Sequence, residues 1–167
     1  MFGELDLDVF HVEVVLPRYV FRATCKPLGG FLTYFNDRRR NYLPFENVTI
    51  HPLSPMRQLE VIKQAKITVR RTEMVSISVL SEEEMGKIRI LDSSREVVFY
   101  ANQFAFQGAL HVNSDTSNDD LLDETRDFYP MKGVKIAPLE KMASSPIRQV
   151  PLMLLGRAFV TLYTVKE

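Results

Sequence analysis

Residues 43–53 read Leu43-Pro44-Phe45-Glu46-Asn47-Val48-Thr49-Ile50-His51-Pro52-Leu53, and residues 129–139 read Tyr129-Pro130-Met131-Lys132-Gly133-Val134-Lys135-Ile136-Ala137-Pro138-Leu139. Both stretches start with an apolar or aromatic residue and proline, pass a turn residue, and end in Val-x-Ile-x-Pro-Leu. Similar segments flank them, since 19–23 resembles 104–108 and 74–78 resembles 159–163. A repeated unit constrains the architecture before any element is assigned. The sequence therefore predicts an internal duplication, with repeats at residues 1–84 and 85–167.

Each repeat has the alternating apolar pattern of β-strands and one short segment with helical character. In the first repeat we expect strands at 12–26, 47–51, 66–70 and 75–79, with a helix at 32–40. In the second we expect strands at 96–112, 134–136 and 152–165, with a helix opening at Ser117. We predict a mainly β protein of two tandem small β-barrels or half-barrels, related by pseudo-twofold symmetry. A single sandwich in which the two copies pair is the alternative.

Two local signals refine this plan. Asn47 and Gly133 occupy equivalent places, and both residue types tolerate a positive φ angle, so we expect a shared turn there. Between the repeats, residues 81–86 read Ser-Glu-Glu-Glu-Met-Gly, which predicts one helical turn with a serine cap and a glycine stop.

Composition limits the possible functions. The chain has 167 residues, 46% hydrophobic and 25% charged, with a net charge of zero. Residues 1–84 carry 11 basic and 11 acidic side chains, and residues 85–167 carry 10 of each. A whole-molecule attraction to nucleic acid or to an anionic membrane is therefore not expected.

The N-terminus and the cysteine content indicate a compartment. The single Cys25 excludes an internal disulfide and a multi-cysteine zinc site. The acidic start of the chain is not that of a secretory signal, and no apolar run is long enough to span a membrane. We expect a cytoplasmic protein that does not contact membranes.

No motif in the sequence predicts catalysis. His11, His51 and His111 lie on or beside predicted strands, and none has a second ligand at metal-binding spacing. Cys25 aligns with Leu110, which indicates a small core residue. We therefore expect no enzymatic activity, no cofactor and no metal.

Charged side chains supply the candidate binding residues. A basic and aromatic set in the first repeat is suited to nucleic acid or to a protein partner: Arg38, Arg39, Arg40, Arg70, Arg71, Tyr34 and Tyr42. The equivalent part of the second repeat offers an acidic face: Asp119, Asp120, Asp123, Glu124 and Asp127. Opposite charges at equivalent places favour pairing between the copies or between subunits.

We predict a non-enzymatic binding or scaffold module that binds a protein partner or itself. Single-stranded nucleic-acid binding by an Sm-like or OB-like small barrel is the alternative.

One resemblance supports the fold. Residues 32–36, Leu-Thr-Tyr-Phe-Asn, and residues 42–47, Tyr-Leu-Pro-Phe-Glu-Asn, resemble segments of a small uncharacterised bacterial β domain. The resemblance covers the first repeat, and it reaches the second through Tyr129-Pro130 and the apolar alternation. It implies a tandem copy of that domain. No catalytic residue or ligand comes with it.

Overall fold

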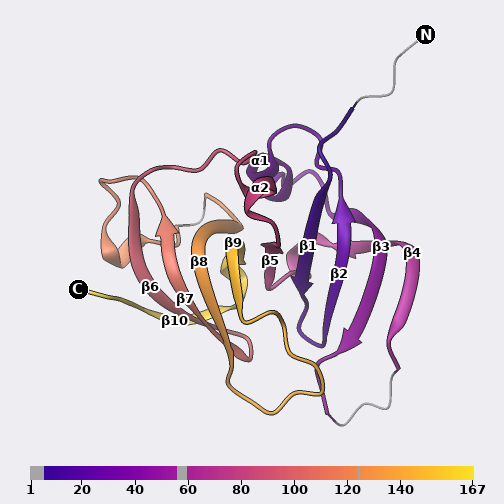
Figure 1. Ribbon diagram of the computed structural model, residues 1–167. Helices are drawn as coiled ribbons and strands as arrows, with labels where there is room; N and C mark the ends of the chain where they lie inside the picture. Colours follow the sequence, from indigo (N-terminus) through magenta and orange to yellow (C-terminus); the bar gives the residue numbers. More distant parts are fainter. Residues whose placement is uncertain (1–5, 56–59, 124) are drawn as a thin grey trace.

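The computed structural model describes residues 6–55, 60–123 and 125–167, and it is mainly β (Figure 1). Within these described residues, ten strands form one antiparallel sheet. They are β1 (Phe10–Val15), β2 (Tyr19–Cys25), β3 (Tyr42–Pro52), β4 (Ile62–Arg70), β5 (Ser76–Val79), β6 (Ser94–Ala101), β7 (Phe104–His111), β8 (Phe128–Pro138), β9 (Gln149–Gly156) and β10 (Val160–Val165).

Helical structure is short. The part of the chain that the structure describes has two α-helices, α1 (Phe31–Asn36) and α2 (Glu82–Met85), and three 3-10 turns, η1 (Arg71–Glu73), η2 (Asn118–Asp120) and η3 (Arg157–Phe159). The predicted helical turn at 81–86 is confirmed as α2, where the Ser81 hydroxyl accepts the Glu84 N–H at 3.3 Å. The helix expected after Ser117 is reduced to the 3-10 turn η2. In the described residues, none of the helices has the length and apolar content of a membrane span.

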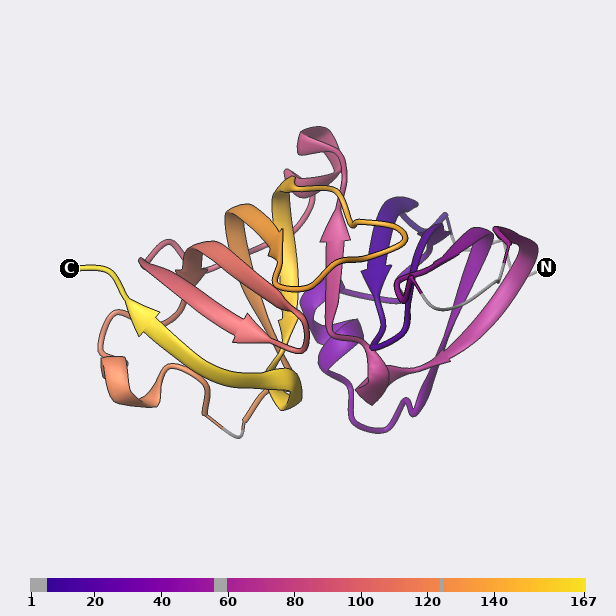
Figure 2. The ribbon, with the colours of Figure 1, turned by 90° about the horizontal axis from the view of Figure 1, so that it is seen from below.

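The strand order repeats along the sheet. The first half (β1 to β5) is ordered β5-β1-β2-β3-β4, and the second half (β6 to β10) is ordered β10-β6-β7-β8-β9. The pairing of β5 with β9 joins the halves, which leaves β4 and β10 as the two outer edges. In Figure 1, β4 lies on the right side of the molecule and β10 on the left, whereas in Figure 2 the end of β4 and the start of β10 both lie near the middle.

This order does not give the predicted closed barrels. Closing the second half would need β9 to pair with β10, but β9 pairs with β5 of the first half. The two halves therefore share one open sheet, and the predicted pseudo-twofold relation between two barrels is not confirmed. The boundary predicted after residue 84 falls inside α2.

Two expected long strands are hairpins. The segment 12–26 divides into β1 and β2, because Pro17 has no N–H to donate and the chain turns at residues 16–18. The segment 96–112 divides into β6 and β7, with Asn102 in the turn at φ 54°.

A matching irregularity marks both halves. Between β2 and β3 the pairing jumps from Arg22–Thr49 to Thr24–Glu46, which leaves one extra residue on β3. The pairing of β7 with β8 is interrupted in the same way, between Gln107 and Ala109. Asn47 and Gly133 lie in these bulges with φ angles of 53° and 58°. Their positive φ is confirmed, although the site is a β-bulge within a strand.

Two apolar cores lie along the sheet, and each includes residues from the other half. The first core, mainly from β1 to β5, also contains Phe128, Leu152 and Leu154. The second core, mainly from β6 to β10, also contains Val15 and Val75, among others. The boundary between the halves is therefore packed on both faces.

Candidate functional site

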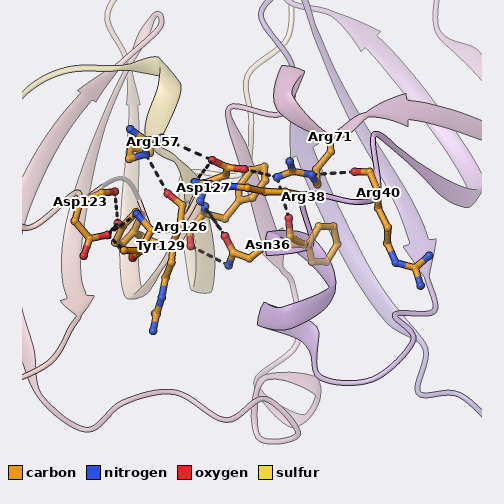
Figure 3. A network of polar contacts seen from close by, with 12 residues as sticks. Asn36, Arg38, Arg40, Arg71, Asp123, Arg126, Asp127, Tyr129 and Arg157 are labelled. Atoms are coloured by element: carbon orange, nitrogen blue, oxygen red, sulfur yellow. Dashed lines mark hydrogen bonds and ion pairs between the residues drawn. The ribbon is translucent and has the colours of Figure 1, made fainter.

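Asp127 lies where the two halves meet, immediately before β8. Its carboxylate accepts a hydrogen bond from Arg71, with Nη1 to Oδ2 at 2.7 Å, and another from Arg38, with Nη2 to Oδ1 at 3.3 Å. Arg157 Nη2 is 3.7 Å from Oδ1. Figure 3 shows Asp127 between Arg157 on one side and Arg71 on the other. A single carboxylate thus faces three guanidinium groups from both halves.

Arg71 and Arg157 have equivalent positions in the two halves. Each opens a 3-10 turn directly after a strand, β4 for Arg71 and β9 for Arg157. Arg71 Nε donates to the Arg40 carbonyl at 3.0 Å, and Arg157 Nε donates to the Arg126 carbonyl at 3.0 Å. Their side chains differ in exposure, 4% for Arg71 and 29% for Arg157. Arg71 is therefore the desolvated member of the pair, and loss of the Asp127 charge would destabilise Arg71 more than Arg157.

Asn36 fixes the position of the Asp127 backbone. It is the last residue of α1, and its Oδ1 accepts the N–H groups of Asp127 at 3.1 Å and Phe128 at 2.9 Å. Its Nδ2 donates to the carbonyls of Phe128 at 3.1 Å and Leu32 at 3.0 Å. The side chain thus replaces a backbone partner at the start of β8, and it holds α1 of the first half against the second half.

Electrostatics at this site favour the ionised carboxylate. Burial tends to raise the pKa of Asp127, but the hydrogen bonds from Arg71 and Arg38 outweigh that effect and hold the pKa below its ordinary value. Asp127 is therefore negative at neutral pH, as its three cationic neighbours require.

A second hydrogen-bonded group lies beside the first. The Tyr129 hydroxyl is 2.6 Å from Asp123 Oδ1, and Thr125 Oγ1 donates to the same oxygen at 2.5 Å. These bonds from Thr125 and Tyr129 lower the pKa of Asp123. Burial and the neighbouring Asp123 raise the pKa of Tyr129, so its hydroxyl remains protonated. This arrangement orders the backbone that leads into β8.

A groove of about 600 Å³ opens at the same boundary. Its wall combines cationic, anionic, polar and apolar groups, which are Leu32, Thr33, Asn36, Asp37, Arg39, Arg89, Ile90, Leu91, Arg126 and Pro130. Arg39 is paired with Asp37 at 2.9 Å from Nε to Oδ1, and 91% of its side chain is exposed. Arg89 and Arg126 place two further guanidinium groups beside the apolar wall, which suits an anionic ligand with an apolar part.

The predicted basic set is distributed over different environments. Arg38 and Arg71 bind Asp127, and Arg39 lines the groove. Arg40 lies 5.2 Å from the ring centroid of Tyr34, and Figure 3 shows its side chain pointing away from Asp127. Tyr34 itself is in the first core, with 6% of its surface exposed.

Arg70 and Tyr42 form a separate exposed pair at the β4 edge. The Arg70 guanidinium lies 5.8 Å from the ring centroid of Tyr42, and Nη2 donates to the Tyr42 hydroxyl at 3.2 Å. This pair faces solvent rather than the groove, since neither residue lines it.

The predicted acidic set is divided in the same way. Asp123 and Asp127 make the contacts above, whereas Asp119 and Asp120 are exposed on η2. Glu124 lies outside the described residues. The Tyr163 hydroxyl donates to the Asn118 carbonyl at 2.9 Å, which places η2 next to β10.

Two further titratable candidates, Cys25 and His11, have structural surroundings. Cys25 is buried, and burial together with the nearby Glu84 raises the pKa of its thiol to about 12, so the thiol stays protonated. His11 Nδ1 lies 2.6 Å from Glu84 Oε1. Within residues 6–55, 60–123 and 125–167, no three His, Cys, Asp or Glu side chains are grouped as metal ligands.

Sequence reasoning missed Arg157, Asn36, Arg89 and Arg126. Arg157 had a signal, because it follows Arg71 at the spacing that relates Pro44 to Pro130. Asn36 had none, since its partners Asp127 and Phe128 are distant in sequence and only the fold brings them close.

Comparisons with known proteins add no relative. No protein-family model matches the chain, and neither a curated protein nor a solved structure matches it. What the chain binds is therefore inferred from its own contacts.

Proposed function

We propose that this chain is a non-enzymatic binding or scaffold module that acts on protein partners, with self-association among its interactions. The open sheet carries the proposal, because β4 and β10 are its outer edges and an edge strand offers backbone donors and acceptors to another strand. Large apolar side chains near these edges are exposed, 55% for Tyr42 and 54% for Leu162. A cytoplasmic location is part of the proposal, and the reduced, buried Cys25 is consistent with it.

We further propose that the two halves descend from one ancestral unit, a domain similar to the uncharacterised bacterial β domain noted above. Three observations support a duplication. The strand order is the same in both halves, the β-bulges with Asn47 and Gly133 correspond, and Arg71 and Arg157 make the same Nε contact to a backbone carbonyl. The prediction allowed closed barrels or half-barrels. Two half-barrels whose edge strands pair with each other are consistent with the open sheet.

Light scattering tests the binding proposal. We expect the purified chain to have a mass above that of the monomer, or to form a stoichiometric complex with a protein from its source cell. A chain that is monomeric at every concentration and salt, and that captures no protein, would contradict the proposal.

Single-stranded nucleic acid is the second candidate ligand, and the groove at the boundary favours it. Arg39, Arg89 and Arg126 line this groove together with the exposed apolar Leu91. Guanidinium groups contact phosphates, and their planes or nearby apolar side chains can stack on bases.

Fluorescence anisotropy with short oligonucleotides tests this candidate. We expect salt-sensitive binding that is weakened by Arg89→Glu and by Arg126→Glu. Lys63→Glu, on β4, is the control and should leave binding unchanged. Absence of salt-sensitive binding at micromolar protein would remove nucleic acid as a candidate.

A further inference from the structure

The two outer edges of the sheet differ in charge. Sheet edges present unpaired backbone groups, and natural proteins protect them with charged side chains, lysine above all. β4 carries Lys63, Lys66 and Arg70 along its length. β10 reads Val-Thr-Leu-Tyr-Thr-Val and carries no charge. One edge is therefore protected against a further strand, and the other is not.

The internal junction, where β5 pairs with β9, shows which features allow two strand edges of this fold to pair. β5 is fully buried because β9 pairs with it and inserts Leu152 and Leu154 into the first core. At the end of β9, Gly156 allows the backbones to approach closely. A Cβ at Gly156 would lie 2.5 Å from the Met74 carbonyl oxygen and 3.0 Å from that of Val75.

β4 lacks these features. The register of β3–β4 matches that of β8–β9, with Tyr42 paired to Arg70 and Phe128 paired to Gly156. Arg70 therefore stands where the junction requires glycine. A head-to-tail contact, in which β10 of one copy adds to β4 of another, would bring the Arg70 Cβ against the backbone.

β4 also lacks counterparts of the two leucines that β9 inserts into the first core. By the same register, Lys66 corresponds to Leu152 and Thr68 to Leu154. In a head-to-tail contact these polar side chains would face the apolar edge of the second core. Burial of an unpaired lysine charge there is unfavourable.

The second core is incompletely covered beside β10. Tyr163 pairs with Phe99 on β6 as Ile77 pairs with Val14 on β1, so Tyr163 and Ile77 have equivalent positions. Ile77 is completely buried, because β9 covers it. The Tyr163 hydroxyl donates a hydrogen bond to the Asn118 carbonyl of η2, but the side chain is still only half-buried, and so is Val165 farther along β10.

We propose that two copies of this chain associate through β10, with the two β10 strands antiparallel about a twofold axis. A twofold interface uses the same surface on both subunits, so an uncharged apolar edge is complementary to itself. The contact covers Leu162, Tyr163 and Val165 and extends the sheet across both subunits. The inference rests on the proposed function, and it names β10 as the surface and a second copy as the partner.

Light scattering over a concentration series, with Leu162→Lys, tests the proposal. We expect the wild type to be a dimer and Leu162→Lys to be a monomer. Ile62→Lys is the matched control, because Ile62 is an exposed apolar residue on the opposite edge; this variant should remain dimeric. Since both substitutions replace exposed side chains, the circular dichroism spectra should not change.

Hydrogen exchange gives a direct readout of the edge. Amides of β10 should gain protection as the protein concentration rises, whereas β4 amides should not.

The outcomes separate the two proposals. If the wild type associates and Leu162→Lys has no effect, the β10 interface is wrong but the binding function stands. If both variants are monomeric and a mixture of them restores a dimer, association is head-to-tail and the twofold proposal is wrong. If the wild type is a monomer at all concentrations, the β10 proposal is wrong. The binding function then depends on the capture of another protein.

Discussion

Asp127 shows how one side chain can join two halves of a sheet. Its carboxylate is the counter-charge of Arg71, whose side chain is 4% exposed and also bonds a backbone carbonyl through Nε. A buried guanidinium without a carboxylate partner is costly, whereas an exposed ion pair contributes little. The contribution of Asp127 to stability should therefore come mainly from Arg71 rather than from Arg38.

We predict that Asp127→Ala lowers the free energy of unfolding by about 3 kcal/mol, because it leaves the Arg71 charge buried without its partner. Arg38→Ala is the control, since the Arg38 side chain is 54% exposed; its loss should cost less than about 1 kcal/mol. Urea denaturation followed by circular dichroism measures both. Equal losses for the two variants would show that the carboxylate does not act through Arg71.

The same carboxylate should give the protein a pH-dependent stability. The folded state has a lowered Asp127 pKa, so the stabilisation is complete above the unfolded value of about 3.9 and is lost as the pH falls through the folded pKa. The difference in unfolding free energy between wild type and Asp127→Asn should therefore shrink on acidification below that unfolded value. A difference that stays constant in this range would contradict the assigned pKa direction.

At the scale of elements, sequence patterns located strands better than they located turns. The apolar alternation of residues 12–26 continues through both arms of a hairpin, so it does not reveal where the chain reverses. Pro17 and Asn102 carried the missing information, one by its lack of an N–H and the other by its tolerance of positive φ. Conversely, Asn47 and Gly133 predicted the backbone conformation of both bulges, because few residues adopt positive φ without strain.

We predict that Gly133→Ala costs about 1 kcal/mol of stability, because alanine is strained at a φ of 58°. Apart from the two adjacent residues, no atom lies within 4 Å of the added Cβ, so the cost is conformational. Gly133→Asn should cost less, since asparagine occupies the equivalent position 47 in the same conformation. Thermal denaturation compares the two variants, and an asparagine variant no more stable than the alanine variant would contradict this account.

At the scale of the whole molecule, the sequence indicated two similar halves but not their union in one sheet. The pairing of β5 with β9 joins segments that are far apart in the chain, and no local pattern encodes it. The continuous apolar run Leu152 to Leu155 is typical of a strand buried on both faces. It indicates that this strand lies between two cores, but it does not identify β5 as the pairing partner. The candidate site at Asp127 could not be predicted from the sequence for the same reason, because Asn36, Arg71 and Asp127 come together only when the two halves pack.

We predict that the two halves unfold as one cooperative unit, because each core contains residues of the other half. Leu154→Ala removes a completely buried side chain of the first core and should cost about 3 kcal/mol. Native-state hydrogen exchange should show equal loss of protection in the most stable amides of β2 and β7. Loss confined to β2 would show that the halves unfold separately.

The lysines of β4 limit how many copies of the chain can associate. A sheet whose two ends both accepted strands would add copies without limit and form fibres. Lys63 and Lys66 make the two edges unequal, and in the proposed association a copy is added at the uncharged β10 edge alone. A pair proposed to join at β10 would have lysine-bearing β4 strands at both free edges, so it would stop as a closed dimer.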